Sequence, residues 1–412
     1  MDKVDIKYRL LKVIQSFNRI KNIRFNYPEP GLSEPYKPVP LAVIKEYNKF
    51  RPLGPRKLLC YVPFSNMSFS SGGRVLACNY NPKVLLGKYP EKSLKEMWSG
   101  DSAIELRNHL GHNDFTYGCE FCSGFLLNHK FSGLKPQAYD KYSSGSQQIN
   151  FPKVMEFELS NTCNLECVMC DGLASSSIRK NRENLPPVYN PYDDEFIRQL
   201  AEFIPHLKEA KFYGGEPFLI DIYFKIWDKI IELNPKIKIF AITNGTVLNH
   251  RIKDLLKRGN FDLAISLDSV NKEKYMSIRK NSDFDKVMAN LDYFNNYCRS
   301  RNRAMSISTT LMRINWEDVP GMISFANSKG AQTFFSYLKR PEHLGLYNLD
   351  PEELHKIREK LSDCDFPEDT MQQKYNKYCF HDFLNQLEIW EENNIQFQKN
   401  TGSSLNINTE NQ

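Results

Sequence analysis

The chain has 412 residues, with 55 Lys and Arg against 49 Asp and Glu and a net charge of +6. So small an excess over so long a chain gives no concentrated basic field, and we expect no nucleic-acid partner. Residues 1–5 lack the apolar core of a signal peptide, and no stretch reaches the roughly 20 apolar residues that a membrane helix needs. We therefore expect a cytoplasmic protein without a membrane partner.

The first 142 residues predict two segments. Over residues 1–56 we expect an N-terminal helix in 1–25, where apolar residues recur near the helical period, followed by an extended, proline-rich connector. Residues 57–142 combine short apolar runs, a Ser/Gly turn at 70–73 and a helix-like stretch at 93–110. This pattern indicates a small compact unit that needs more than core burial to be stable.

Residues 151–345 alternate apolar strand-like runs with amphipathic helices. We predict strands at 154–159, 209–213, 237–242, 263–267, 305–310 and 333–337, and helices near 193–207, 220–234, 249–258, 283–301 and 316–329. Repeated β-α units predict an α/β fold with a parallel sheet, here a partial (β/α)6 barrel with its site at the carboxyl ends of the strands. Residues 346–394 are predicted to be helical, and the polar residues 395–412 to be a disordered tail.

Seven of the ten cysteines fall into two groups. Without a secretion signal these thiols should stay reduced, so their clustering indicates metal or redox chemistry. Cys163, Cys167 and Cys170 follow the first strand of the repeated region in a C-x3-C-x2-C loop. Three thiolates can ligate three irons of a four-iron cluster and leave the fourth iron open, which implies catalysis.

This loop resembles that of the radical S-adenosylmethionine (radical SAM) superfamily, whose open iron is chelated by the amino and carboxylate groups of the cofactor. The likeness continues in GGEP, TN and SLDS motifs at the ends of the next three strands and in an arginine soon after them. Glycines let the backbone approach a ligand, and a glutamate can accept from an ammonium group. The resemblance implies that the following residues contact the cofactor: Gly214, Gly215, Glu216, Pro217, Thr243, Asn244, Ser266, Asp268, Arg279 and, where the family usually has an aromatic side chain, Met169.

A second group of four cysteines precedes the repeated region: Cys60, Cys78, Cys119 and Cys122. Four thiolates can close a cluster, although they would also suit zinc. Together with Leu-Gly at 86–87 and Met-Trp at 97–98, the group resembles SPASM and Twitch domains. Because it has four cysteines rather than the larger SPASM set, it is most similar to Twitch, and it implies one auxiliary 4Fe-4S cluster. Such units usually follow the barrel, whereas this one precedes it.

The resemblance implies a function. A low-potential donor such as a flavodoxin or ferredoxin would reduce the first cluster, and cleavage of S-adenosylmethionine would give a 5′-deoxyadenosyl radical that abstracts a substrate hydrogen. With an auxiliary cluster as electron acceptor, we predict an oxidoreductase-type enzyme that oxidises or cross-links a small molecule or a peptide. Two alternatives are a peptide or protein maturase whose N-terminal unit is a substrate-binding, possibly zinc-containing, module, and a non-catalytic electron carrier. Asp171, Lys211 and Tyr213 lie near predicted strand ends, but the sequence assigns none of them as a catalytic base.

Overall fold

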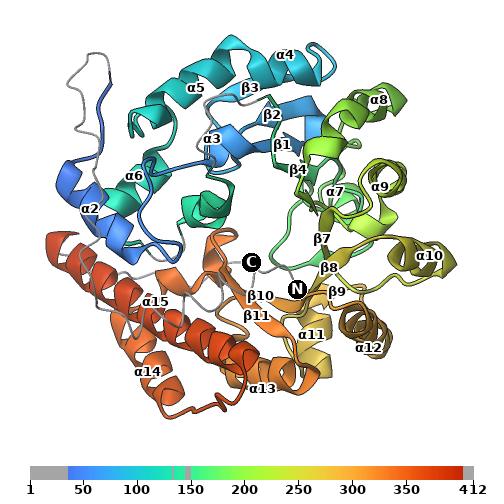
Figure 1. Ribbon diagram of the computed structural model, residues 1–412. Helices are drawn as coiled ribbons and strands as arrows, with labels where there is room; N and C mark the ends of the chain where they lie inside the picture. The colour runs from blue at the N-terminus through green and yellow to red at the C-terminus, as the bar shows by residue number, and fades with distance from the viewer. Residues whose placement is uncertain (1–35, 132–133, 144–149, 402–412) are drawn as a thin grey trace. The chain divides into compact units, whose positions relative to one another are not determined.

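The computed structural model describes residues 36–131, 134–143 and 150–401, which form two compact units. The first unit contains the described residues of Met1–Asn161, Pro187–Phe240 and Lys257–Asn260, and the second contains those of Thr162–Pro186, Ala241–Leu256 and Phe261–Gln412. Figure 1 labels the helices and strands of both. The helix predicted within residues 1–25 lies outside the described residues.

The first unit is built on a mostly parallel sheet. Its strands follow in the spatial order β6 (Glu209–Phe212), β4 (Val154–Glu158), β1 (Asn66–Ser70), β2 (Arg74–Leu76) and β3 (Leu85–Lys88). β4 pairs in parallel with both β6 and β1, whereas β2 pairs antiparallel with β1 and β3. Strands from the cysteine-rich segment therefore extend the sheet that β4 and β6 begin.

The link from β1 to β2 is η1 (Ser71–Gly73), at the turn that the sequence predicts. Gly73 has a φ of 82°, and a Cβ atom there would lie 2.1 Å from the carbonyl oxygen of Tyr89. Only glycine suits this close approach, so the turn fixes the path of the chain between β1 and β2.

The other elements of the first unit are helical. They are α2 (Leu41–Phe50), α3 (Val62–Ser65), α4 (Leu94–Ser99), α5 (Asp101–Gly111), α6 (Glu120–Leu127), η2 (Lys135–Tyr142), α8 (Asp194–Phe203), η3 (Ile204–His206), η4 (Pro217–Leu219) and α9 (Asp221–Leu233). The helix α8 shows why such segments form. The Asp193 side chain accepts from the backbone N–H of Phe196 at its N-terminus, and its buried residues recur at helical spacing.

The helix α2 corrects one prediction, since the extended connector expected up to residue 56 is wrong for Leu41–Phe50. The prolines lie on either side of this run, and Pro40 stands directly before the first helical residue. Within the run, Val43, Ile44 and Tyr47 are buried at the spacing of one helix face. Overall proline content concealed a short amphipathic helix.

The second unit continues the alternation of strands and helices. Its strands β8 (Phe261–Ser266), β10 (Met305–Leu311) and β11 (Gln332–Tyr337) are parallel neighbours, and β7 (Lys238–Thr243) contains the division between the units. A separate antiparallel pair joins β5 (Glu166–Cys167) to β9 (Arg279–Lys280). Helices and 3-10 turns of this part of the chain are α7 (Ser176–Asn181), α10 (His250–Arg258), α11 (Lys272–Ile278), α12 (Phe284–Ser300), η5 (Trp316–Asp318), α13 (Val319–Lys329), η6 (Glu342–Leu344), η7 (Leu346–Asn348), α14 (Pro351–Ser362) and α15 (Met371–Thr401). The predicted α/β fold with a parallel sheet is confirmed.

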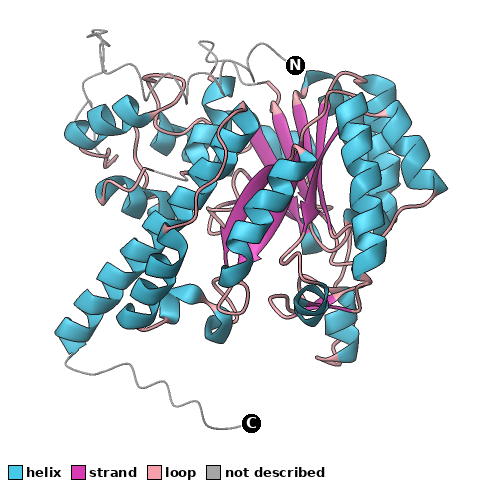
Figure 2. Ribbon diagram, turned by 90° about the horizontal axis from the view of Figure 1, so that it is seen from below, coloured by secondary structure: helices cyan, strands magenta, loops and turns pink. Residues whose placement is uncertain are grey.

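The C-terminal helices pack beside β11, as Figure 1 shows. The backbone N–H of Thr333 donates to the Asn376 side chain over 2.7 Å, which ties β11 to α15. α15 is the long helix that leads to the C end in Figure 2, and it continues to Thr401. The disordered tail predicted from residue 395 is therefore wrong as far as residue 401, because Asn394 donates to the carbonyl oxygens of Tyr347 and Leu349 and holds the last turns in place.

No helix in the described ranges combines the length and the apolar content needed to cross a membrane.

A buried ion pair gives the fold a direct test. Arg51 contacts the Asp140 carboxylate through two nitrogens, at 2.8 and 2.6 Å, and both side chains are fully buried. Replacing Arg51→Met should lower the free energy of unfolding by about 3–5 kcal/mol, because Asp140 would keep a buried charge without its partner. Denaturant unfolding followed by circular dichroism measures this loss.

The matched control is Arg198→Met. Arg198 pairs with Glu195 but is 76% exposed, so the expected loss is below about 1 kcal/mol. Equal losses in the two variants would contradict the role given to Arg51.

Candidate active site and auxiliary cysteine centre

The three-cysteine loop of the second unit is held by serine side chains. The Cys163 N–H donates to Ser176 Oγ over 3.1 Å, and Ser177 Oγ donates to the Cys163 carbonyl over 2.8 Å. Ser175 Oγ donates to the Leu165 carbonyl over 2.6 Å and also caps α7. Composition gave no sign of this role, which depends on the loop folding back on α7.

The strand pair β5–β9 places Cys167 opposite Arg279. The guanidinium Nη1 lies 3.9 Å from Cys167 Sγ, and Nε lies 2.7 Å from Asp268 Oδ2. Burial opposes the charge on Arg279, but Asp268 and Cys167 outweigh it and raise its pKa. A fixed positive charge therefore lies beside the predicted cluster loop.

The thiols themselves interact. A hydrogen bond between Cys167 and Cys170 raises the pKa of Cys167 and lowers that of Cys170. Arg279 favours the charged form of both thiols, because its positive charge compensates a thiolate. Cys170 is therefore the thiol of this pair that ionises more readily.

Polar groups at the end of β7 face the same loop. Asn244 Nδ2 lies 3.8 Å from Cys163 Sγ and 3.1 Å from Asn164 Oδ1. Thr246 Oγ1 donates to Asn244 Oδ1 over 2.7 Å, and Thr243 Oγ1 accepts from the Gly245 N–H over 3.1 Å. The structure therefore brings the TN motif and Cys163 together.

Two of the remaining predicted residues of the second unit, Met169 and Asp268, have protein partners. Met169 packs against Ile278, Met312 and Leu338. Asp268 Oδ1 accepts from the Thr310 N–H over 2.7 Å, while Oδ2 faces Arg279, so both carboxylate oxygens are engaged. Ser266 is half-buried at the end of β8. Their assignment to the cofactor stays a prediction.

The GGEP residues belong to the first unit. Gly214 has a φ of 80°, and a Cβ atom there would lie 2.9 Å from the Ser160 carbonyl oxygen. Gly215 also has a positive φ, and the buried Glu216 accepts from the Phe218 N–H over 3.0 Å at the start of η4, where Pro217 is the first residue. Gly214 is thus required by its positive φ and by the close packing of Glu158 and Ser160 against it.

Tyr223, which the sequence did not single out, supports the ends of two neighbouring strands. The Tyr223 hydroxyl accepts from the Leu159 N–H over 2.9 Å and lies 2.8 Å from the Tyr213 carbonyl oxygen. It therefore holds the ends of β4 and β6 together. A fully buried tyrosine needs polar partners, and this requirement is the only signal that could have indicated its role.

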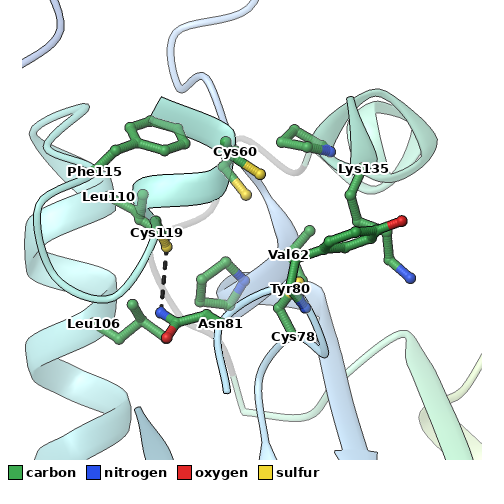
Figure 3. A pocket seen from close by; sticks show the side chains of 13 residues that line it. Cys60, Val62, Cys78, Tyr80, Asn81, Leu106, Leu110, Phe115, Cys119 and Lys135 are labelled. Atoms are coloured by element: carbon green, nitrogen blue, oxygen red, sulfur yellow. Dashed lines mark hydrogen bonds between the residues drawn. The ribbon is translucent and has the colours of Figure 1, made fainter. Parts of the chain in front are cut away.

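The four N-terminal cysteines line one pocket of the first unit (Figure 3). Cys60 precedes α3, Cys78 follows β2, and Cys119 and Cys122 lie at the start of α6. Asn81 Nδ2 donates to Cys119 Sγ over 3.3 Å, and the Tyr80 N–H donates to Cys78 Sγ over 3.4 Å. The apolar part of the wall is formed by Val62, Leu106, Leu110 and Phe115.

Burial and mutual repulsion disfavour the charged form of the thiols in this pocket. Burial raises the pKa of Cys60, and the neighbouring thiols Cys119 and Cys78 raise it further. Burial and the neighbouring thiols also raise the pKa of Cys119 and of Cys122 to about 12. Four such thiols cannot all ionise without a compensating cation, which bound iron would supply.

Four thiols that line one pocket suit either a zinc ion or a closed four-iron cluster.

The three side chains considered as bases have structural partners. Lys211 Nζ lies 3.3 Å from Glu156 Oε1, and burial lowers the pKa of Lys211. Asp171 accepts from the N–H groups of Leu173 and Ala174. Burial raises the pKa of Tyr213. None of these contacts assigns a base.

Comparison with known families agrees with these two centres. The Radical SAM superfamily matches residues 157–326, and SPASM, an iron-sulfur cluster-binding domain, matches residues 60–123. Residues 157–326 therefore form a radical SAM domain, and residues 60–123 form a SPASM domain. A radical SAM domain binds S-adenosylmethionine and a 4Fe-4S cluster, and a SPASM domain binds auxiliary iron-sulfur clusters. The predicted order, with the cluster domain first, is confirmed.

Several curated proteins are similar to part of the chain. A probable GTP 3′,8-cyclase of Methanosarcina acetivorans is 25% identical over 50% of this chain and 61% of its own length. The GTP 3′,8-cyclase of Corynebacterium glutamicum is 28% identical over 50% of this chain and 55% of its own. An AdoMet-dependent heme synthase of Methanosarcina barkeri is 25% identical over 48% of this chain and 53% of its own length. The chain thus spans a little more than half the length of these relatives.

Among solved structures, Streptococcus suis SuiB bound to S-adenosylmethionine aligns with a TM-score of 0.40 and 17% identity, over 62% of this chain and 60% of that chain. Native anSMEcpe with bound AdoMet aligns with a TM-score of 0.41 and 21% identity, over 57% of this chain and 62% of that chain.

The two cysteine groups should hold separate iron. Anaerobically reconstituted wild-type protein is expected to contain about eight irons, falling to about four when Cys163, Cys167 and Cys170 are all replaced by Ala. Replacing Cys60, Cys78, Cys119 and Cys122 together should also leave about four. Iron and sulfide assays measure both losses.

The control is Cys298→Ala, which removes a buried thiol of α12 and should leave the iron content unchanged. Loss of all iron in the first variant, with zinc remaining, would contradict an iron-sulfur centre in the N-terminal pocket.

Proposed function

We propose that this enzyme removes a hydrogen atom from a substrate carbon and then oxidises or cross-links the resulting radical. The observation that carries the proposal is the difference between the two thiol groups. Three cysteines lie on a loop beside Arg279 and Asn244, whereas four others line one pocket. A three-thiol site leaves one iron open for chemistry, and a four-thiol site leaves none.

When bound and reduced, the three-thiolate cluster supplies the electron that splits S-adenosylmethionine into methionine and a 5′-deoxyadenosyl radical. For this chemistry, the serines of α7 orient the cysteine loop, and Arg279 compensates thiolate charge. We assign the open turn at Gly214 and Gly215 to close contact with the cofactor, with Glu216 facing its ammonium group. Thr243, Asn244, Ser266, Asp268 and Met169 complete the proposed cofactor set.

In the proposed oxidation, the substrate radical left by hydrogen abstraction loses one electron and one proton and becomes a closed-shell product. The four-thiol pocket offers a place for the electron, and a flavodoxin or ferredoxin would carry it away and supply the reducing electron for the cofactor. The proton passes to a group that the structure does not assign. This outcome would make the enzyme an oxidoreductase.

Two substrate classes remain in the proposal. The curated relatives are named for a nucleotide cyclisation and a heme synthesis, which favours a small molecule. A peptide would make the enzyme a maturase with the N-terminal unit in substrate binding. The electron-carrier alternative differs from both because it requires no cofactor cleavage.

Cofactor cleavage tests the proposal. Dithionite-reduced wild-type protein should convert S-adenosylmethionine into 5′-deoxyadenosine, and the variant without Cys163, Cys167 and Cys170 should fall to background. Liquid chromatography with mass spectrometry measures the product. An electron carrier would give no 5′-deoxyadenosine in either protein.

Hydrogen abstraction has its own readout. When extract from cells grown in heavy water is divided into peptide and small-molecule fractions, the fraction containing the substrate should transfer one deuterium to 5′-deoxyadenosine. Transfer from the small-molecule fraction alone would exclude the maturase alternative, and transfer from neither fraction would contradict hydrogen abstraction from a substrate carbon.

A further inference from the structure

Lys135 is the only lysine in the lining of the four-cysteine pocket formed by described residues, and Figure 3 shows it opposite the apolar wall. It begins η2, and its side chain is 18% exposed. Its ammonium group lies over the ring of Tyr80, 5.7 Å from the ring centre. A buried ammonium in this position needs a counter-charge to remain ionised.

That counter-charge is Glu156, at the centre of β4. Its Oε1 lies 3.2 Å from Lys135 Nζ and 3.3 Å from Lys211 Nζ, and it accepts from the Tyr139 hydroxyl over 2.8 Å. The Glu156 side chain is 2% exposed. One carboxylate is therefore shared by two ammonium groups.

Other charged side chains surround this network. Glu209 pairs with Lys141 at 2.5 Å and also acts on Lys211, and Glu158 acts on Glu156. Lys83 pairs with Glu120 on the surface, where the two side chains are 69% and 55% exposed, so solvent screens that pair. Lys135 is the pocket-lining cation, and its positive charge acts on the thiols of Cys78 and Cys122.

We propose that Lys135, held by Glu156, raises the reduction potential of the auxiliary cluster so that it can accept the electron of the substrate radical. Reduction adds one negative charge to a centre that already carries four thiolates, and an adjacent positive charge stabilises that state. The inference rests on the proposed function only in placing an iron-sulfur cluster in this pocket. Lys135 acts through charge and ligates no iron.

The test is a redox titration of full-length protein in which Cys163, Cys167 and Cys170 are Ala, so that only the auxiliary cluster contributes. The reduced cluster is followed by electron paramagnetic resonance. Lys135→Met should reduce the ratio of reduced to oxidised cluster about tenfold at a given potential, which for one electron is about 59 mV. Lys135→Arg keeps the charge and should restore the original potential.

Lys83→Met is the matched control. It removes one positive charge from an exposed position within the same N-terminal region, residues 57–142, and should leave the potential unchanged. An unchanged potential in Lys135→Met with its iron retained would overturn the inference. If Lys135→Met loses its cluster, Lys211→Met decides, since it removes the second ammonium group held by Glu156 and lies outside the pocket wall. A lower potential there supports the inference, and an unchanged one overturns it.

Failure of the proposed function would look different. In that case the parent protein with Lys135 intact would show no iron-sulfur signal from the four-cysteine pocket, and the inference would fall with it.

Discussion

The parallel pairing of β1 with β4 joins the cysteine-rich segment to the first strand of the repeated region. Five residue pairs run in register, from Asn66 opposite Val154 to Ser70 opposite Glu158. Asn66 donates to the carbonyl oxygen of Ala77, the residue before Cys78, and lies 3.4 Å from Glu156 Oε2. The pairing therefore connects the pocket of four thiols to the polar face of β4, and a cluster domain that precedes the barrel in sequence can still share its sheet.

Charge compensation distinguishes the two thiol groups. In the second unit a guanidinium and an amide lie directly beside the sulfur atoms of the three-cysteine loop. In the first unit the thiols line one pocket, burial raises the pKa values of Cys60 and Cys119, and the pocket-lining Lys135 is paired with Glu156. The first arrangement suits a cluster that must bind a charged cofactor, and the second suits a closed cluster whose potential is set by its surroundings.

Local sequence signals predicted the repeated strands well. The predicted ranges 154–159 and 305–310 correspond to Val154–Glu158 and Met305–Leu311, because long apolar runs and amphipathic helices have strong periodicity. The pairs β1–β4 and β5–β9 join residues far apart in sequence, and β5 and β9 have two residues each, so no local pattern could reveal them. Cysteine spacing identified both thiol groups, but Lys135 could not be found this way. Glu156 carried one clue, since a carboxylate within an apolar strand requires partners.

The central claim is that the cluster at Cys163, Cys167 and Cys170 has an open iron and the cluster at the other four cysteines has none. The most direct measurement is the electron paramagnetic resonance spectrum of each reduced cluster with and without S-adenosylmethionine, in variants that retain only one cluster. The account predicts that the cofactor changes the spectrum of the three-cysteine cluster and leaves that of the four-cysteine cluster unchanged. A cofactor-induced change in the four-cysteine cluster, or none in the three-cysteine cluster, would contradict it.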